Sequence, residues 1–183
     1  MKKNLVRILA LLLIAAMLLP LCARAEENTA EEDTGQTVYE EYPVSTAEDL
    51  EKLAELCRLD SASKNLKVIL NGDIDLKDME DFPTFGGIFD GQNHKLYGLV
   101  VNQDGSAQGL FRYIQEGATV KNLEIIGRVT PSGSSTKVGG LAGVNAGTVE
   151  NVSFFGAVCG ISQVGGIVGL NEVSGRVEKC TMK

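Results

Sequence analysis

Apolar residues first recur at helical spacing between residues 46 and 59. The apolar positions of this segment are Leu50, Leu53, Ala54 and Cys57. Their i, i+3, i+4, i+7 spacing places them on one face of a helix. Ser45 and Glu48 are spaced as a capping box, and the polar run Asp60–Ser63 favours a turn at the other end. We therefore predict one amphipathic helix from Thr46 to Leu59.

Beyond Lys64 the pattern changes to short apolar runs separated by glycine and asparagine. The runs cover residues 66–70, 74–76, 95–101, 120–126, 149–155 and 177–181. Each run is short for a helix and is bounded by turn-forming residues, which is typical of strands. The chain beyond Lys64 is therefore predicted to be all-β.

Several stretches of this region repeat. Val138–Asn145 returns 26 residues later as Val164–Asn171, with five of its eight residues unchanged. Residues 147–150 match 175–178 at an offset of 28, and residues 119–123 match 148–152 at an offset of 29. Fixed blocks whose spacing changes only in the turns are typical of a solenoid, in which each repeat buries its apolar side against the next.

The repeats predict the fold and its stacked pairs. We expect an all-β fold, a right-handed parallel β-helix (solenoid) with one N-terminal capping α-helix. Asn145 should stack on Asn171, because side-chain amides in register can hydrogen-bond along a column. The other expected pairs are Gly140 with Gly166 and Gly143 with Gly169 at tight corners that need positive φ or close backbone approach, and Leu141 with Ile167 and Val144 with Leu170 in the core.

The N-terminus has the order of a secretory signal peptide. A basic start with Lys2, Lys3 and Arg7 precedes an apolar run over residues 8–21 and the small-x-small sequence Ala23–Ala25. We therefore predict a signal peptide over residues 1–25. Residues 26–41 are acidic with few large apolar side chains, which predicts a flexible spacer, and residues 42–183 form the predicted helix-capped solenoid.

Charge and cysteine content exclude some functions. The formal net charge is −7, and removal of residues 1–25, which hold four basic and no acidic residues, makes it −11. Nucleic acid and anionic membranes need clustered Lys and Arg, so neither is an expected partner. Cys57, Cys159 and Cys180 are too few for a disulfide framework, and a bridge between Cys159 and Cys180 stays open.

Three ordered blocks resemble a known family. Ser45–Leu50, Asp73–Leu76 and Gly87–His94 are similar to the N-terminal part of GLUG-motif proteins, and the two Val-Gly-Gly blocks resemble the GLUG repeat. The resemblance covers residues 42–183. It implies a helix-capped parallel solenoid in bacterial secreted or surface proteins of adhesin type. The repeat also occurs in some immunoglobulin A metallopeptidases, whose zinc segment needs two histidines, and this chain holds one.

Candidate chemistry in the chain is sparse. His94, the only histidine, has no second metal ligand or nucleophile at a suggestive spacing. The acidic cluster comprises Asp73, Asp75, Asp78, Glu80 and Asp81, and it favours a solvated turn, with calcium binding left open. Glu150 and Glu178 should stack as a charged column, although two carboxylates at this spacing also occur in retaining glycosidases. We assign no catalytic, cofactor-binding or metal-ligating residue, and we expect no cofactor.

These observations favour a non-enzymatic function. We expect a bacterial secreted or cell-surface repeat module for adhesion or ligand binding, with a host or matrix protein or a polysaccharide as its extracellular partner. The alternatives are a carbohydrate-active β-helix enzyme, either a polysaccharide lyase or a glycosidase, and the non-catalytic N-terminal part of a larger surface protein such as a metallopeptidase. No membrane contact is expected beyond the signal peptide.

The two ends of the predicted solenoid differ. The helix over residues 46–59 can cap the first coil, whereas residues 177–183 offer an unpaired strand edge. We expect either further repeats beyond this edge or edge-to-edge self-association.

The predicted signal peptide leads to a testable prediction about the mature chain. Cleavage after Ala25 should give a secreted chain that begins at Glu26, because the signal-peptidase pattern ends at that alanine. Intact-mass measurement of protein from the culture medium tests the cleavage site. Cytoplasmic retention, or a different mature start, would contradict the prediction.

Overall fold

Parallel strand pairing organises the described part of the chain, which in this computed structural model comprises residues 37–76, 79 and 82–183. The predicted signal peptide and residues 26–36 of the predicted spacer lie outside the described residues. One helix, α2 (Ala47–Leu56), follows the first strand, β1 (Glu40–Val44). The remaining strands are β2 (Leu66–Leu70), β3 (Ile74–Asp75), β4 (Phe82–Phe85), β5 (Ile88–Asp90), β6 (Lys95–Val101), β7 (Phe111–Ile114), β8 (Thr119–Val129), β9 (Thr136–Gly139), β10 (Ala142–Asn145), β11 (Thr148–Val158), β12 (Ser162–Gly165), β13 (Val168–Asn171), β14 (Arg176–Glu178) and β15 (Thr181–Met182).

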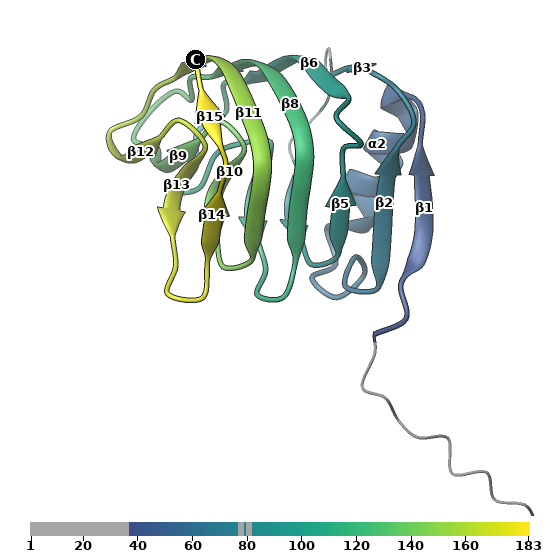
Figure 1. The fold of residues 1–183 in the computed structure, drawn as a ribbon. Helices are drawn as coiled ribbons and strands as arrows, with labels where there is room; N and C mark the ends of the chain where they lie inside the picture. The colour runs from purple at the N-terminus through teal and green to yellow at the C-terminus, as the bar shows by residue number, and fades with distance from the viewer. Residues whose placement is uncertain (1–36, 77–78, 80–81) are drawn as a thin grey trace, which may run out of the picture. The chain divides into compact units, whose positions relative to one another are not determined.

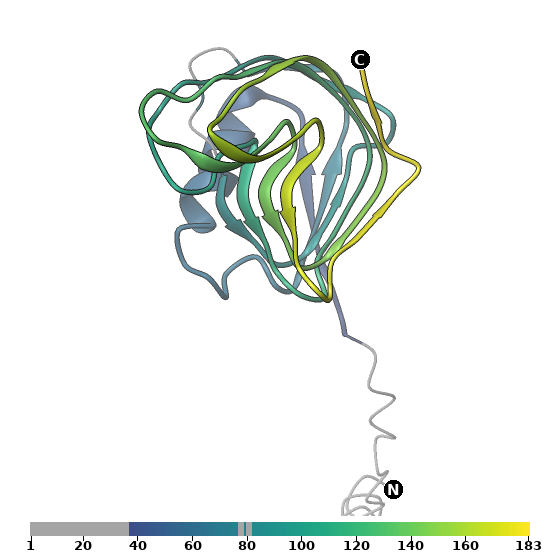
Figure 2. The same cartoon turned by 90° about the vertical axis from the view of Figure 1, so that its left-hand side faces the viewer.

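The strands form three sheets that wrap around one core. The front sheet runs in the order β1-β2-β5-β8-β11-β14, with β3, β6 and β15 extending it at one end. The back sheet has the order β13-β10-β7-β4, and a third sheet pairs β12 with β9. Every pairing among the named strands is parallel. Successive coils advance with a right-handed sense, as Figures 1 and 2 show, so the predicted parallel β-helix is confirmed.

Strand register confirms the repeats read from the sequence. Val144 pairs with Leu170 at an offset of 26, and Val149 pairs with Val177 at 28 and with Val120 at 29. The offset differs between strands because the turns differ in length while the strands stay in register. The solenoid therefore repeats by stacked position and not by a single fixed period.

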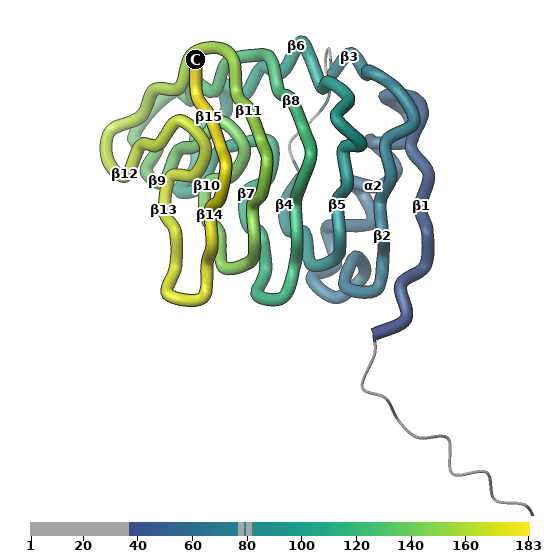
Figure 3. Tube along the Cα trace, in the orientation of Figure 1, coloured from purple at the N-terminus to yellow at the C-terminus, as the bar shows by residue number. Residues whose placement is uncertain are grey.

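The helix covers the first coil where later coils have a back strand. It packs against β4, and Figure 3 shows the trace running from β1 through α2 to β2. The predicted apolar stripe is buried, but the capping box is one residue later than predicted. Asp49 N–H donates to Thr46 Oγ1 at 3.2 Å, and Thr46 N–H donates to Asp49 Oδ2 at 3.0 Å. Glu48 instead pairs with Lys52 one turn on, at 2.9 Å.

Element boundaries differ from the sequence prediction in several places. The helix ends at Leu56 and not at Leu59, because the chain turns from Cys57 onward. β1 begins at Glu40, inside the predicted spacer. The run 177–181 divides into β14 and β15 at Lys179, whose φ is 53°. The back strands were missed because they are short and, in β10 and β13, contain glycine, which lowers strand propensity.

Aromatic side chains fill the core near the helical cap. Phe82, Phe85, Phe89 and Phe111 are fully buried, and their ring centroids lie 4.9–6.4 Å apart. Aromatic pairs at this distance contribute beyond the area that they bury. The predicted core pairs are buried in one coil only, since Leu141 and Val144 are buried whereas Ile167 and Leu170 are partly exposed.

Close backbone approach, rather than positive φ, explains the paired glycines. Gly140 is not among the positive-φ residues, and its N–H donates to Gly166 O at 3.3 Å. A Cβ on Gly140 would lie 2.5 Å from that oxygen and 2.5 Å from the Phe154 ring. A Cβ on Gly166 would meet the side chain of Met182, which is partly exposed and can move. The two corners are thus equivalent in register but differ in tolerance.

Substitution of Gly140 by Val should lower the free energy of unfolding by at least about 2 kcal/mol, because overpacking against backbone and a buried ring has no easy relief. Gly166→Val should have a smaller effect. Gly72→Val is the matched control, since a Cβ there meets nothing within 4 Å. Denaturant unfolding of the three variants checks the order, and equal stability of Gly140→Val and the control would refute the close approach.

Candidate functional site

The front sheet bends along one line, and this line determines its outer face. Each bend residue adopts the left-handed conformation: φ is 64° at Asn93, 54° at Asn122, 53° at Asn151 and 53° at Lys179. Asparagine tolerates this conformation better than most residues. The bend separates β5 from β6 and β14 from β15, whereas β8 and β11 continue through it.

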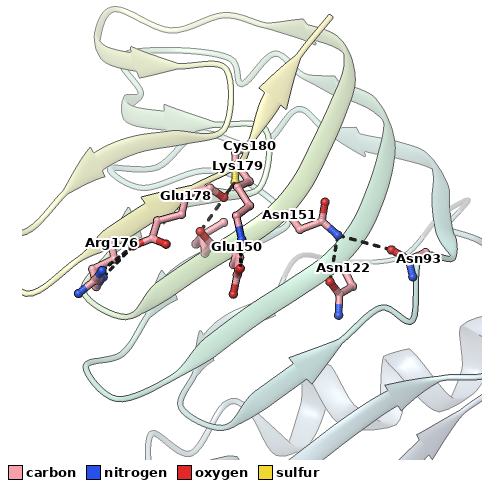
Figure 4. A network of polar contacts seen from close by, with 9 residues as sticks. Asn93, Asn122, Glu150, Asn151, Arg176, Glu178, Lys179 and Cys180 are labelled. Carbon is pink, nitrogen blue, oxygen red and sulfur yellow. Dashed lines mark hydrogen bonds and ion pairs between the residues drawn. The ribbon is translucent and has the colours of Figure 1, made fainter.

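The three asparagines form a ladder of side-chain amides across three coils (Figure 4). Asn151 Nδ2 donates to Asn122 Oδ1 at 3.0 Å and lies 3.5 Å from Asn93 Oδ1. We call Asn93, Asn122 and Asn151 the amide row. Amides carry both donors and acceptors, so a row on the surface can bind a neutral polar ligand.

Asp90 holds the amide row in place from the interior of the fold. It is buried, and its Oδ1 accepts hydrogen bonds from Asn122 Nδ2 at 3.0 Å and from Gln92 N–H at 3.1 Å. Lys121 Nζ lies 3.4 Å from Asp90 Oδ2. Burial by itself raises the pKa of Asp90, but the hydrogen bonds from Asn122 and Gln92 and the charge of Lys121 outweigh burial and hold the pKa below its usual value. Asp90 is therefore ionised at neutral pH and orients Asn122.

An apolar row runs parallel to the amide row, a few residues beyond the bend in each coil. Tyr97 pairs with Ile126, and Ile126 pairs with Phe155, in register across β6, β8 and β11. Tyr97 and Ile126 are 41% and 38% exposed, and Phe155 is partly exposed with Lys183 Nζ 5.2 Å from its ring centroid. Their neighbours Leu96, Ile125 and Phe154 are fully buried, so the alternation along each strand directs the apolar row outward.

Charged side chains lie beside the amide row, on β11 and β14 and at the bend position Lys179. Glu150 pairs in register with Glu178, which confirms the predicted column. Lys179 Nζ lies 2.9 Å from Glu150 Oε1, and Arg176 donates to Glu178 Oε1 at 2.6 Å. The Arg176 guanidinium lowers the pKa of Glu178. Each carboxylate therefore has its own cation, and Glu178 does not hold a proton near neutral pH.

His94 and Asp73 form a polar contact between the residues that directly precede β6 and β3. His94 Nδ1 lies 3.3 Å from Asp73 Oδ1, which also accepts from Lys95 N–H at 2.9 Å. The hydrogen bond from Lys95 N–H, which is the largest cause, and the contact with His94 lower the pKa of Asp73, against a smaller raising by burial. Asp73 thus holds the turn before β6. Asp78, Glu80 and Asp81 of the predicted acidic cluster lie outside the described residues.

The cysteines show no pairing in this part of the chain. Cys57, Cys159 and Cys180 are free thiols, so Cys159 and Cys180 do not form a bridge. Burial raises the pKa of Cys57 to about 11, against a smaller lowering by Ser63, and burial also raises the pKa of Cys180. Both thiols are therefore protonated and weak nucleophiles at neutral pH.

Two structural features are absent from the described residues. Among residues 37–76, 79 and 82–183, no group of three or more His, Cys, Asp or Glu side chains is arranged to hold a metal ion. In the same residues, no helix has the length and apolar character to cross a bilayer.

Sequence reasoning missed both rows of the outer face. The match of residues 119–123 to 148–152 already aligned Asn122 with Asn151, but two extra residues in the turn before Lys95 hid Asn93. The apolar row was hidden inside the strand runs, since Ile126 and Phe155 follow a buried apolar residue in each. Consecutive apolar residues at one strand end were the only signal.

Comparison with known proteins leaves the family undetermined. No family model matches the chain, and no solved structure matches it. A protein of Evansella cellulosilytica named "Putative Gly-rich membrane protein" is 38% identical over 71 residues. The match covers 38% of this chain, and the chain spans 8% of the relative's length. The resemblance to GLUG-motif proteins stays a prediction.

Replacement of Asp90 tests the anchor of the amide row. Asp90→Asn should lower the free energy of unfolding by about 1 kcal/mol at pH 7, because it weakens hydrogen bonds to a carboxylate. The folded-state pKa lies below the unfolded value of about 3.9, so the stabilisation is present above that pH and is lost as pH falls through the folded-state pKa. The gap between wild type and Asp90→Asn should therefore narrow below about pH 4.

Urea unfolding at pH 7, 5, 4 and 3 measures this gap. Glu116→Gln, at an exposed carboxyl away from the row, is the control. A gap that stays constant down to pH 3 would show that Asp90 does not stabilise the fold through its charge.

Proposed function

We propose that the protein is an exported, non-enzymatic surface module that binds an extended ligand along the outer face of the front sheet. The observation that carries this proposal is the parallel course of the amide row and the apolar row across the same three coils. One row offers donors and acceptors, and the other offers exposed apolar surface.

The spacing of the rows favours a repetitive polymer. Neighbouring strands lie about 4.8 Å apart, so each row presents a contact at that interval along the solenoid axis. A polysaccharide is the ligand class that fits best, because sugar hydroxyls hydrogen-bond to amides and the apolar faces of sugar rings pack on aromatic side chains such as Tyr97. The carboxylates Glu150 and Glu178 are each paired with a cation, which disfavours acid–base work on the bound chain.

Location at the bacterial cell surface or in the medium is part of the proposal. The predicted signal peptide supports export, and the similar protein of Evansella cellulosilytica is named a membrane protein. The resemblance to GLUG-motif proteins supports the same location and an adhesin-like role.

Tyr97→Ala should weaken polysaccharide binding about tenfold, because an exposed aromatic that packs on a ligand often contributes at least about 1.4 kcal/mol. Leu59→Ala is the control, since Leu59 is a similarly exposed apolar residue away from the face. Co-sedimentation with insoluble cell-wall and plant polysaccharides measures binding.

Two outcomes of this experiment would overturn the proposal. Equal binding of Tyr97→Ala and Leu59→Ala would exclude the apolar row as the contact. Release of soluble sugar fragments during the same incubation would show that the protein is an enzyme.

A further inference from the structure

Arg128 is an exposed cation on the outer face of the front sheet. It lies two residues beyond Ile126 on β8, and both residues that flank it, Gly127 and Val129, are less exposed. Because side chains alternate between the two faces of a strand, Arg128 points to the same side as Ile126 of the apolar row. The two residues are about 7 Å apart along the strand. A ligand that lies on the apolar row is therefore within reach of the long Arg128 side chain.

The other basic side chains in the described strands of the front sheet are each paired with a carboxylate. The pairs are Lys67 with Glu41 at 2.9 Å, Lys95 with Glu124 at 3.0 Å, Lys121 with Asp90 at 3.4 Å and Arg176 with Glu178 at 2.6 Å. Among the described residues, the side chain of Arg128 has neither an ion pair nor a hydrogen bond. Acidic residues outnumber basic residues by 24 to 17, so a shortage of carboxylates does not explain this difference.

The neighbours of Arg128 across the sheet offer it no partner. Val100 of β6 and Ala157 of β11 pair with Arg128 in register, on strands that lie side by side in Figure 1, and both are exposed. Neither side chain can accept a hydrogen bond, so the N–H donors of the guanidinium face solvent. A guanidinium is planar and binds a carboxylate through two parallel hydrogen bonds. The outer face thus has one open carboxylate-binding position beside its apolar row.

We propose that the polysaccharide bound by the front sheet carries carboxylate groups, as uronic acids do, and that Arg128 binds one of them while a sugar ring packs on Tyr97 and Ile126. This inference rests on the proposed function and names the class of its ligand. A sulfate or phosphate group presents three terminal oxygens in a tetrahedral arrangement, and Val100 and Ala157 supply no side-chain donor for them. One guanidinium therefore matches a carboxylate better than either group.

The charge of the chain limits how many carboxylates the ligand carries. The formal net charge is −7, and the in-register column of Val100, Arg128 and Ala157 contains one cation. Such a surface repels a polymer with an anionic group on every sugar. We therefore expect the carboxylated sugars of the ligand to be separated by neutral sugars.

Polygalacturonate with different degrees of methyl esterification tests the inference, because the backbone stays the same while its charge changes. In isothermal titration calorimetry, the exported chain should bind the half-esterified polymer at least about tenfold more tightly than the fully esterified, neutral polymer, since hydrogen bonds between ionised groups are the stronger ones. Arg128→Gln should bind both polymers with the affinity of the wild type for the neutral one. Arg128→Lys should keep part of the preference, because an ammonium keeps the charge but lacks the planar fork.

Lys52→Gln is the matched control. It removes one positive charge, as Arg128→Gln does, from an exposed ion pair with Glu48 at 2.9 Å on α2. It should keep the full preference for the half-esterified polymer. Tyr97→Ala should weaken binding of both polymers by the same factor, because it removes a ring contact and no charge. Circular dichroism of each variant verifies the fold.

The outcomes separate this inference from the proposed function. Equal binding of the half-esterified and neutral polymers by the wild type would overturn the inference and leave the proposed function intact. An equal loss of preference in Arg128→Gln and Lys52→Gln would also overturn it, because overall charge would then set the preference. Tighter binding of dextran sulfate than of the half-esterified polymer would exclude a carboxylate as the preferred group. Absence of binding to every polymer, charged or neutral, would refute the proposed function itself.

Discussion

Parallel backbone hydrogen bonds place each residue over its counterpart in the previous coil, about 4.8 Å away. This short spacing between coils determines which side chains can stack in the solenoid. Apolar residues stack without difficulty, as Val120, Val149 and Val177 do in one column. Amides stack because one donates to the next, as Asn145 Nδ2 does to Asn171 Oδ1 at 2.8 Å. Like charges need an added partner, and Lys179 supplies one to Glu150.

The bend in the front sheet is the second constraint on function. A residue in the left-handed conformation bends the front strand in each of these coils, and asparagine occupies three of the four described bend positions. The amide row lies at the bend and the apolar row lies beyond it, and both follow the solenoid axis. Asp90 links this surface to the interior, because its buried carboxylate orients Asn122 and pairs with Lys121. The same residues thus form a structural corner and part of the proposed ligand surface.

A helix separates the first coil of the solenoid from solvent. At the first coil, α2 buries Leu50, Leu53 and Cys57 against the core and replaces a back strand. Capping by a helix therefore closes the first coil within the chain.

The sequence by itself determined the architecture, because the repeated blocks of a solenoid show which residues stack in successive coils. The match of Val138–Asn145 to Val164–Asn171 predicted the stacking of Asn145 on Asn171, and the match of residues 147–150 to 175–178 predicted that of Glu150 on Glu178. The register confirms both. The helix was also predictable from the sequence, because its apolar spacing and a nearby N-terminal cap specify it. The cap residue is Thr46, which has an extended backbone, and not the predicted Ser45.

Only the tertiary structure decided which surface residues come together. Asn93 joins Asn122 and Asn151 although its turn is two residues longer, because the strands before and after the turn stay in register. Tyr97 meets Ile126 and Phe155 for the same reason, and nothing in any single run marks these three as neighbours. Gly140 was identified as a tight position, but whether positive φ or close approach made it so depends on Phe154, which follows it in the chain by 14 residues and contacts it only across the folded core. These features depend on distances between residues that are far apart in the sequence, and the sequence does not give such distances.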